Sequence, residues 1–436
     1  MIDKICIILL ANILFFAKTL SYGYTSDDLP VKQRSDSLEM PWYKRRFFQI
    51  EGGVRVNPQE DHMITAFIHA ITCVMVYIAF GANDISFLAA ILFAFNPINN
   101  QGSVWISGRT YPITAILLMV AMCVPWIAPL AILLAMHYPI GFILSSILIA
   151  WSPWLVLPIG LSALWHFKHV KSLVKCKTDH EMFAEDKKVS WFKVTYVLKT
   201  LGFYTTHALF PIKTTFYHSY MQSLAGSGKD KAKKIDRFFF IGIIVIAIIL
   251  AKFLLTPWDM VSFGLLWWIV GIAPYLNAFR ISQEIAERYA YIPNIGLMFV
   301  LSSLIWHSPA LSAMFIAMYA TKLWFYMDAY QDEYYLVEHA TLNSPDSWFA
   351  WHVKALKRWD VKSYKEAIIM WTMAKMISPR EFKVLFNLAT MLAVVGEMKE
   401  AKSLLKEAEK CVPEGQEVKS FELINNWRNG KYAVLV

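Results

Sequence analysis

The sequence predicts an all-α polytopic membrane protein with a bundle of about 11 transmembrane helices and a C-terminal α-helical domain. Two observations lead to this fold class. Of the 436 residues, 57% are hydrophobic and 17% are charged, whereas soluble domains carry roughly a quarter charged residues. Apolar runs long enough to cross a bilayer recur through residues 1–327, and mixed-charge sequence follows at 328–436. We therefore expect two domains with these bounds.

The apolar runs define the transmembrane helices in order. They cover 5–22, 62–80, 85–99, 110–125, 127–149, 151–167, 195–213, 238–255, 259–277, 289–306 and 309–327. The first run is interpreted as a membrane helix, with a signal peptide as the alternative. The runs 85–99 and 110–125 are short, which suits tilted helices or helices that end inside the protein.

Charge predicts the orientation of the bundle. The loop 168–193 is rich in lysine, which places it on the cytoplasmic side. The segments 23–61, 96–110, 214–237 and 278–288 then share the outer face. The basic stretch 226–237 conflicts with this topology. The chain contains no Asn-x-Ser/Thr sequon, which favours a bacterial inner membrane with a periplasmic site and C-terminal domain, the endoplasmic reticulum being the eukaryotic alternative.

A repeat organises the C-terminal domain. Ala367, Ala374 and Pro379 recur 34 residues later as Ala401, Ala408 and Pro413. This spacing is the tetratricopeptide period, in which alanines allow two helices to approach closely. Two repeats and a capping helix over 416–427 follow from the pattern. Such repeats are generally binding scaffolds, so we expect a protein or peptide partner there.

Composition also excludes some functions. The net charge is +9, but the basic residues lie mainly in loops, where they orient helices and contact anionic lipid. No nucleic-acid partner is expected. The five cysteines show no metal-binding or disulfide spacing. No metal ligands are assigned, although a divalent ion remains compatible with the sequence.

Two polar groups stand in the predicted first outer loop. Asp27 and Asp28 form a carboxylate pair directly after the first apolar run. Such a pair suits general-base catalysis or metal binding, with a solvated loop as the alternative. Arg45 and Arg46 lie in the aromatic stretch "PWYKRRFF". They are interpreted as cations that face lipid headgroups or a lipid-linked phosphate, or as a plain interfacial anchor.

Further candidates lie at the edges of other helices. Ser107 and Arg109 close the polar stretch "NPINNQGSVWISGRTYP", and Arg109 either binds an anion or extends to the interface. Glu287 and Arg288 stand directly before an apolar run, where a functional role is weighed against a salt bridge or a solvated helical face. His69, inside a predicted span, suits an interhelical hydrogen bond.

Several of these segments together resemble one family. "DISFLAAILFAFNPINNQGSVWISGRTYPITAILL", "LKTLGFYTTHALFPIKTTFYHSY" and "AERYAYIPNIGLMFVLS" look like helices of the transmembrane-and-TPR-containing O-mannosyltransferases, in the same order and followed by the repeats. The resemblance implies a GT-C bundle that transfers mannose or a related hexose from a polyprenyl phosphate to a protein hydroxyl, with inversion, on the outer face. The implied transfer reaction depends on membrane lipid and a lipid-linked donor rather than on a bound cofactor.

The resemblance also implies roles for individual residues. Asp28, rather than Asp27, is expected as the general base, and Arg109 and Arg288 match positions suited to holding the donor phosphate. The uncharged "WSPW" at 151–154 departs from the family pattern, as does the small number of repeats. A non-catalytic repeat scaffold anchored in the membrane, and a GT-C enzyme with a polysaccharide acceptor, are the alternative functions.

Overall fold

The structure is a computed structural model. It describes residues 1–28, 57–135, 191–218, 235–278, 285–412 and 417–435, together with short pieces between 141 and 160. Within these ranges all regular secondary structure is helical, and no strand occurs. The predicted all-α class is therefore confirmed for the described part of the chain.

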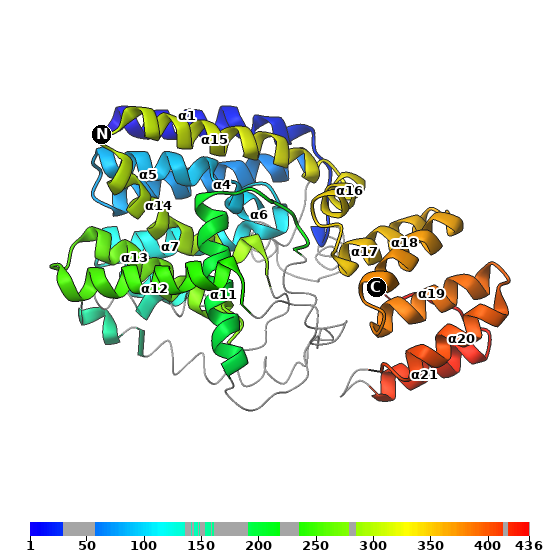
Figure 1. The fold of residues 1–436 in the computed structure, drawn as a ribbon. Coiled ribbons are helices and arrows are strands. Elements are labelled where there is room, and N and C mark those ends of the chain that lie inside the picture. Colours follow the sequence, from blue (N-terminus) through cyan, green and yellow to red (C-terminus); the bar gives the residue numbers. More distant parts are fainter. Residues whose placement is uncertain are drawn as a thin grey trace.

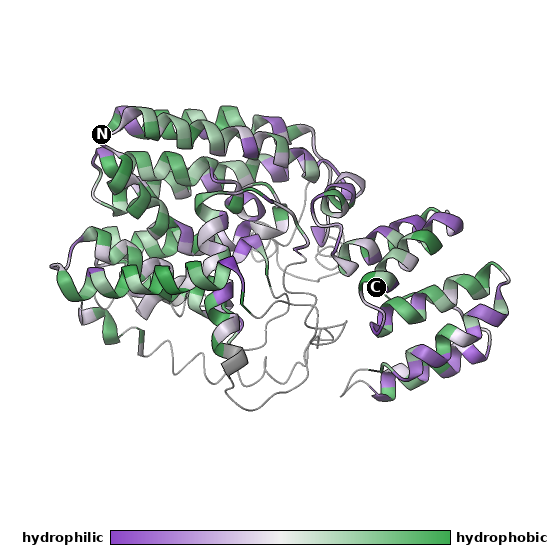
Figure 2. Ribbon diagram, in the orientation of Figure 1, coloured by the Kyte–Doolittle hydropathy of each residue, from purple (hydrophilic) through white to green (hydrophobic). Residues whose placement is uncertain are grey.

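The N-terminal part is a bundle of long apolar helices (Figures 1 and 2). Its helices are α1 (Ile2–Phe16), α4 (Pro58–Ala79), α5 (Asp84–Phe95), α7 (Thr110–Cys123), α8 (Ala128–Ala135), α11 (Trp191–Leu209), α12 (Arg237–Leu255), α13 (Met260–Ile272), α14 (Tyr291–Ile305) and α15 (Pro309–Met327). Helix α4 packs against α1, α5 and α7, while α14 packs against α5 and α13. One continuous apolar core runs through these elements.

Five segments of the described chain are long and apolar enough to cross a membrane. They are Ile2–Ser21, Pro58–Ala79, Ile106–Cys123, Arg237–Leu255 and Pro309–Tyr330. These segments indicate a membrane protein. The helices at the predicted spans 85–99 and 259–277 are apolar but shorter, and most of 127–149 and 151–167 lies outside the described residues.

The C-terminal part consists of more polar helices that lie beside the bundle (Figures 1 and 2). They are α16 (Glu333–Asn343), α17 (Trp348–Asp360), α18 (Tyr364–Ile377), α19 (Phe382–Val394), α20 (Met398–Glu409) and α21 (Glu417–Arg428). Helices α17 and α18 pack as one pair, and α19 and α20 as another. The second pair begins 34 residues after the first at both of its helices, and all four repeated alanines are fully buried.

The polar stretch between α5 and α7 does not form an exposed loop. It folds into three short helical turns, η2 (Pro97–Asn99), α6 (Asn100–Ser103) and η3 (Ile106–Arg109). Asn96, Asn99, Asn100 and Gln101 are all fully buried there. The asparagine side chains find partners within the bundle, since Asn96 donates to Ala208 O at 2.8 Å and Asn99 donates to Phe93 O at 2.7 Å. This stretch carries two residues of the candidate site, Ser107 and Arg109, on η3.

Candidate functional site

The described parts of the predicted outer segments converge at one end of the bundle. Residues 22–28 follow α1 and end in a tight turn in which Asp28 N donates to Thr25 O at 3.1 Å. Ser26 occupies the left-handed region at φ 53°, a conformation that costs energy and is concentrated at functional sites. As a result of this turn, Asp27 is exposed whereas Asp28 is fully buried.

The Asp28 carboxylate anchors this turn to the buried stretch. Asp28 Oδ1 accepts hydrogen bonds from the Ser107 amide at 3.0 Å and from the Ser107 hydroxyl. Asp28 Oδ2 accepts a hydrogen bond from the Thr25 amide at 3.1 Å. A carboxylate that accepts from several donors is fixed in position. The structure thus brings together two of the predicted residues, Asp28 and Ser107.

Gly108 permits this contact. An added Cβ at Gly108 would overlap the carbonyl group of Gln101 in the neighbouring short helix. The backbone of η3 therefore lies directly on that of α6, and only glycine fits there. This close approach sets the position of Ser107 on one side and of Arg109 on the other.

Arg109 points into the bundle and is fully buried. Its Nη2 forms an ion pair with Asp61 Oδ1 at 2.8 Å, and its Nε donates to Thr65 Oγ1 at 2.7 Å. Nη2 also donates to the Asp61 carbonyl. The predicted alternative, in which Arg109 extends to the membrane interface, is wrong because the guanidinium is enclosed among α4 residues. Asp61 compensates its charge.

Arg288 lies in a different environment. It belongs to η7 (Glu287–Ala290), and both its backbone N and its Nη1 donate to Gln101 Oε1 at 3.2 Å. Its guanidinium carbon lies 5.7 Å from the Trp105 ring centre. Burial acts to lower the pKa of Arg288, but neighbouring phenols and Asp27 outweigh it, so the pKa is raised. Among the described residues, no carboxylate forms an ion pair with this cation.

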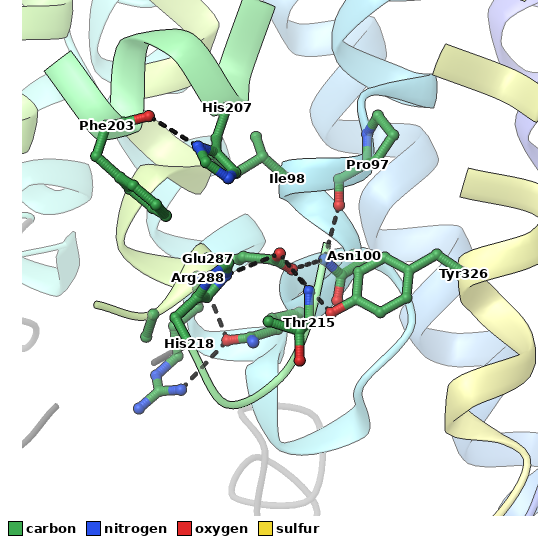
Figure 3. A network of polar contacts seen from close by, with 12 residues as sticks. Pro97, Ile98, Asn100, Phe203, His207, Thr215, His218, Glu287, Arg288 and Tyr326 are labelled. Carbon is green, nitrogen blue, oxygen red and sulfur yellow. Dashed lines mark hydrogen bonds and ion pairs between the residues drawn. The ribbon is translucent and has the colours of Figure 1, made fainter. Parts of the chain in front are cut away.

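The preceding residue, Glu287, is the centre of a buried polar network (Figure 3). Its Oε1 accepts from the Thr215 amide at 3.0 Å and from His218 Nε2 at 3.1 Å. Its Oε2 accepts from Tyr326 Oη at 3.0 Å and from the Asn100 side-chain amide. Four donors from three parts of the chain therefore meet on one carboxylate. Of these partners only His218 is able to carry a positive charge, so the predicted salt-bridge alternative reduces to this contact, and the predicted solvated helical face is wrong because Glu287 is buried.

The same end of the bundle is tied to the start of the C-terminal part. Tyr22 Oη donates to Asp328 Oδ1 at 2.8 Å, and the Gly23 amide donates to Gln331 O at 2.7 Å. The Ser26 amide donates to Glu333 Oε2. Residues 22–28 are thus held by the segment between α15 and α16 as well as by η3.

The remaining predicted residues lie elsewhere. His69 is buried between helices, with Nδ1 2.6 Å from Tyr291 Oη and Nε2 3.2 Å from Ala94 O. This confirms the interhelical hydrogen bond expected for it. Arg45 and Arg46 lie outside the described residues. The part of the chain that is described contains no cluster of three or more His, Cys, Asp or Glu side chains suited to a metal ion.

Sequence reasoning missed four residues of the site. Asp61, Asn100, His218 and Tyr326 supply the partners of Arg109 and Glu287. Asp61 and Tyr326 carry no signal, because an acid in a first helical turn and a tyrosine near a helix end are both common. Asn100 did have a sequence signal, because a polar run between two apolar runs is typical of buried polar groups.

Comparison of the sequence with known families finds no matching family model, and no curated protein matches it either. The function of the site is consequently argued from its own geometry and from the motifs described above.

Proposed function

We propose that this protein is a GT-C glycosyltransferase that transfers a hexose, mannose or a related sugar, from a polyprenyl phosphate to a protein hydroxyl. The observation that carries the proposal is the arrangement at one end of the bundle. There an exposed carboxylate, Asp27, adjoins the turn that Ser107 holds, and Arg288 contacts Gln101 and Trp105 but forms no ion pair within the described residues. A base and a phosphate-binding cation are the two groups that this reaction needs.

The geometry supports Asp27, rather than Asp28, as the general base. A base must come within hydrogen-bond reach of the acceptor hydroxyl. The Asp28 carboxylate is fully buried and is already bound to Ser107 and Thr25, whereas Asp27 is exposed one residue away. In this proposal Asp28 positions the turn, and Asp27 takes the proton as the acceptor oxygen attacks the anomeric carbon. The bond between the anomeric carbon and the phosphate oxygen breaks with its electron pair going to the lipid phosphate. Attack in one step from the face opposite the departing phosphate gives inversion.

Arg288 is the proposed partner of the departing phosphate. The fork of an arginine holds two phosphate oxygens at once, and stabilising charge that develops in the transition state is the larger catalytic task here. Arg109 was predicted in the same role, but Asp61 already compensates its charge. We assign Arg109 the task of fixing η3, and with it Ser107 and Asp28, against α4.

The wider context belongs to the same proposal. About eleven membrane spans would place the site on the periplasmic face of a bacterial inner membrane, or on the lumenal face in a eukaryote. The helical pairs α17–α18 and α19–α20 would be tetratricopeptide repeats that hold the acceptor polypeptide. The 34-residue offset of the two pairs and their buried alanines support this interpretation.

Substitution of each carboxylate tests the assignment. In detergent-solubilised protein supplied with radiolabelled polyprenyl-phosphate mannose and acceptor polypeptide, Asp27→Asn should lower the transfer rate by roughly 10²–10⁴-fold and leave the melting temperature unchanged. Asp28→Asn should lower both, because an amide cannot accept from both Ser107 and Thr25. Normal turnover by the Asp27→Asn enzyme, with a stable but inactive Asp28→Asn enzyme, would return the base to Asp28.

A further inference from the structure

Residues 431–435 lie against helix α19 and are bound by one side chain. Asn387 Nδ2 donates to Leu435 O at 2.7 Å, and Asn387 Oδ1 accepts from the Leu435 amide at 2.7 Å. Asn387 itself is fully buried. One amide side chain thus satisfies both backbone groups of a single residue. Contacts of this kind depend on the peptide backbone and are independent of the side chain that the bound residue carries.

The bound segment has the form of an extended peptide. Residues 431–435 have no regular secondary structure, and Leu435 lies against α19. Tyr432, Val434 and Leu435 pack on the apolar core of the C-terminal helices, while Ala433 between the first two is exposed. The Tyr432 ring lies 5.4 Å from that of Trp427. Alternate burial is characteristic of an extended chain lying on a surface.

The same face of α19 offers a second polar group. Thr390 follows Asn387 by three residues and so lies next to it along the helix. Its hydroxyl is buried, and within the described residues it makes no hydrogen bond. Buried hydroxyls generally have a partner. An extended peptide that continued past the position of Leu435 would run along this face.

We propose that the Asn387 face of α19 is a binding site for an extended peptide with alternating apolar residues, and that segment 431–435 occupies it when no other peptide is bound. The peptide site itself does not depend on the proposed function. Only the statement that the incoming peptide is the acceptor polypeptide rests on it. A tethered occupant acts at an effective concentration in the millimolar range. An external peptide therefore binds only by displacing it, so the segment regulates access to the repeats.

Peptide binding to the full-length protein in detergent tests the proposal without any sugar donor. The probe is a fluorescein-labelled peptide, NGKYAVL, measured by fluorescence polarisation. Replacing Tyr432, Val434 and Leu435 by serine in the protein should release the tethered segment and strengthen probe binding about tenfold or more. In that background, Asn387→Ala and Asn387→Asp should each weaken binding at least about tenfold, because both lose the amide donor.

The matched control is Asn425→Ala, which removes an exposed asparagine side chain from α21. It should bind the probe like its parent, and circular dichroism should show equal helix content in all variants. Equal probe affinity before and after release of the segment, or undiminished binding by both Asn387 variants, would overturn the proposal. Because no donor is present, failure here leaves the transferase assignment standing, and loss of transfer by Asp27→Asn leaves the peptide site standing.

Discussion

Arg109 and Arg288 show how the surroundings of a charged residue limit what it can do. Arg109 has Asp61 at 2.8 Å and no exposed surface. Separating such a pair leaves a buried charge without compensation, which is costly. Arg288 interacts with the neutral Gln101 and with aromatic rings, and these contacts leave its positive charge available to an anion. The sequence analysis expected both arginines to bind the donor phosphate. Their different partners in the structure indicate different roles.

Substitution of Arg109 should therefore reveal a structural role. Arg109→Ala should destabilise the protein by about 3–5 kcal/mol, because Asp61 is left buried and unpaired. The double variant Asp61→Leu/Arg109→Met removes both charges and should recover most of that loss. Thermal unfolding in detergent of Asp61→Leu, Arg109→Met and the double variant gives the coupling energy. A stable but inactive Arg109→Ala enzyme would instead support direct binding of the donor phosphate.

At the scale of elements, the important feature is the buried polar stretch between α5 and α7. Amide side chains there replace the contacts that water would make in an exposed loop, as in the bond from Asn96 to Ala208 O. Irregular backbone that is enclosed by protein requires this satisfaction from protein groups. The stretch can consequently support Ser107 from inside the bundle, which a solvated loop could not do with the same rigidity.

Gly108→Ala tests this support. The added methyl group would meet the Gln101 carbonyl, so η3 must move away from α6 and withdraw Ser107 from Asp28. Overpacking of this kind costs roughly 1–3 kcal/mol, and we expect a lower melting temperature and reduced transfer. Gly160→Ala is the control, because nothing lies within 4 Å of an added Cβ there. Equal activity of the two variants would show that the position of Ser107 is unimportant.

The sequence predicted elements better than partners. Apolar runs located the described helices because burial and membrane crossing both need continuous hydrophobic surface. The 34-residue spacing likewise anticipated the helical pairs and the helix at Glu417–Arg428. The partners of Glu287 could not be predicted, since Asn100 lies 187 residues away and Tyr326 lies 39 residues away. Their meeting depends on how α6 and α15 pack, which a local pattern does not encode.

At the scale of the whole molecule, the C-terminal helices are mechanically connected to the site. Glu333 on α16 accepts from the Ser26 amide and also lies 3.7 Å from Lys357 on α17. Tyr326 on α15 reaches Glu287, the neighbour of Arg288. A displacement of α16 or α17 would therefore also displace residues 22–28. This connection offers a physical route by which a peptide on the repeats could influence the turn that carries Asp27.

Hydrogen exchange can measure that connection. Glu333→Ala removes the acceptor of the Ser26 amide, and losing a hydrogen bond worth about 1 kcal/mol should speed amide exchange in residues 22–28 about fivefold. Glu338→Ala is a matched control on the same helix. Glu338 also pairs with α17, through Lys354 at 2.8 Å and Arg358 at 3.6 Å, but its ion pairs do not involve residues 22–28. Exchange in residues 22–28 should stay at the parental rate in Glu338→Ala. Equal acceleration in both variants would mean that the turn responds to general loosening of α16. No acceleration in either would mean that the contacts to η3, Asp328 and Gln331 hold the turn without Glu333.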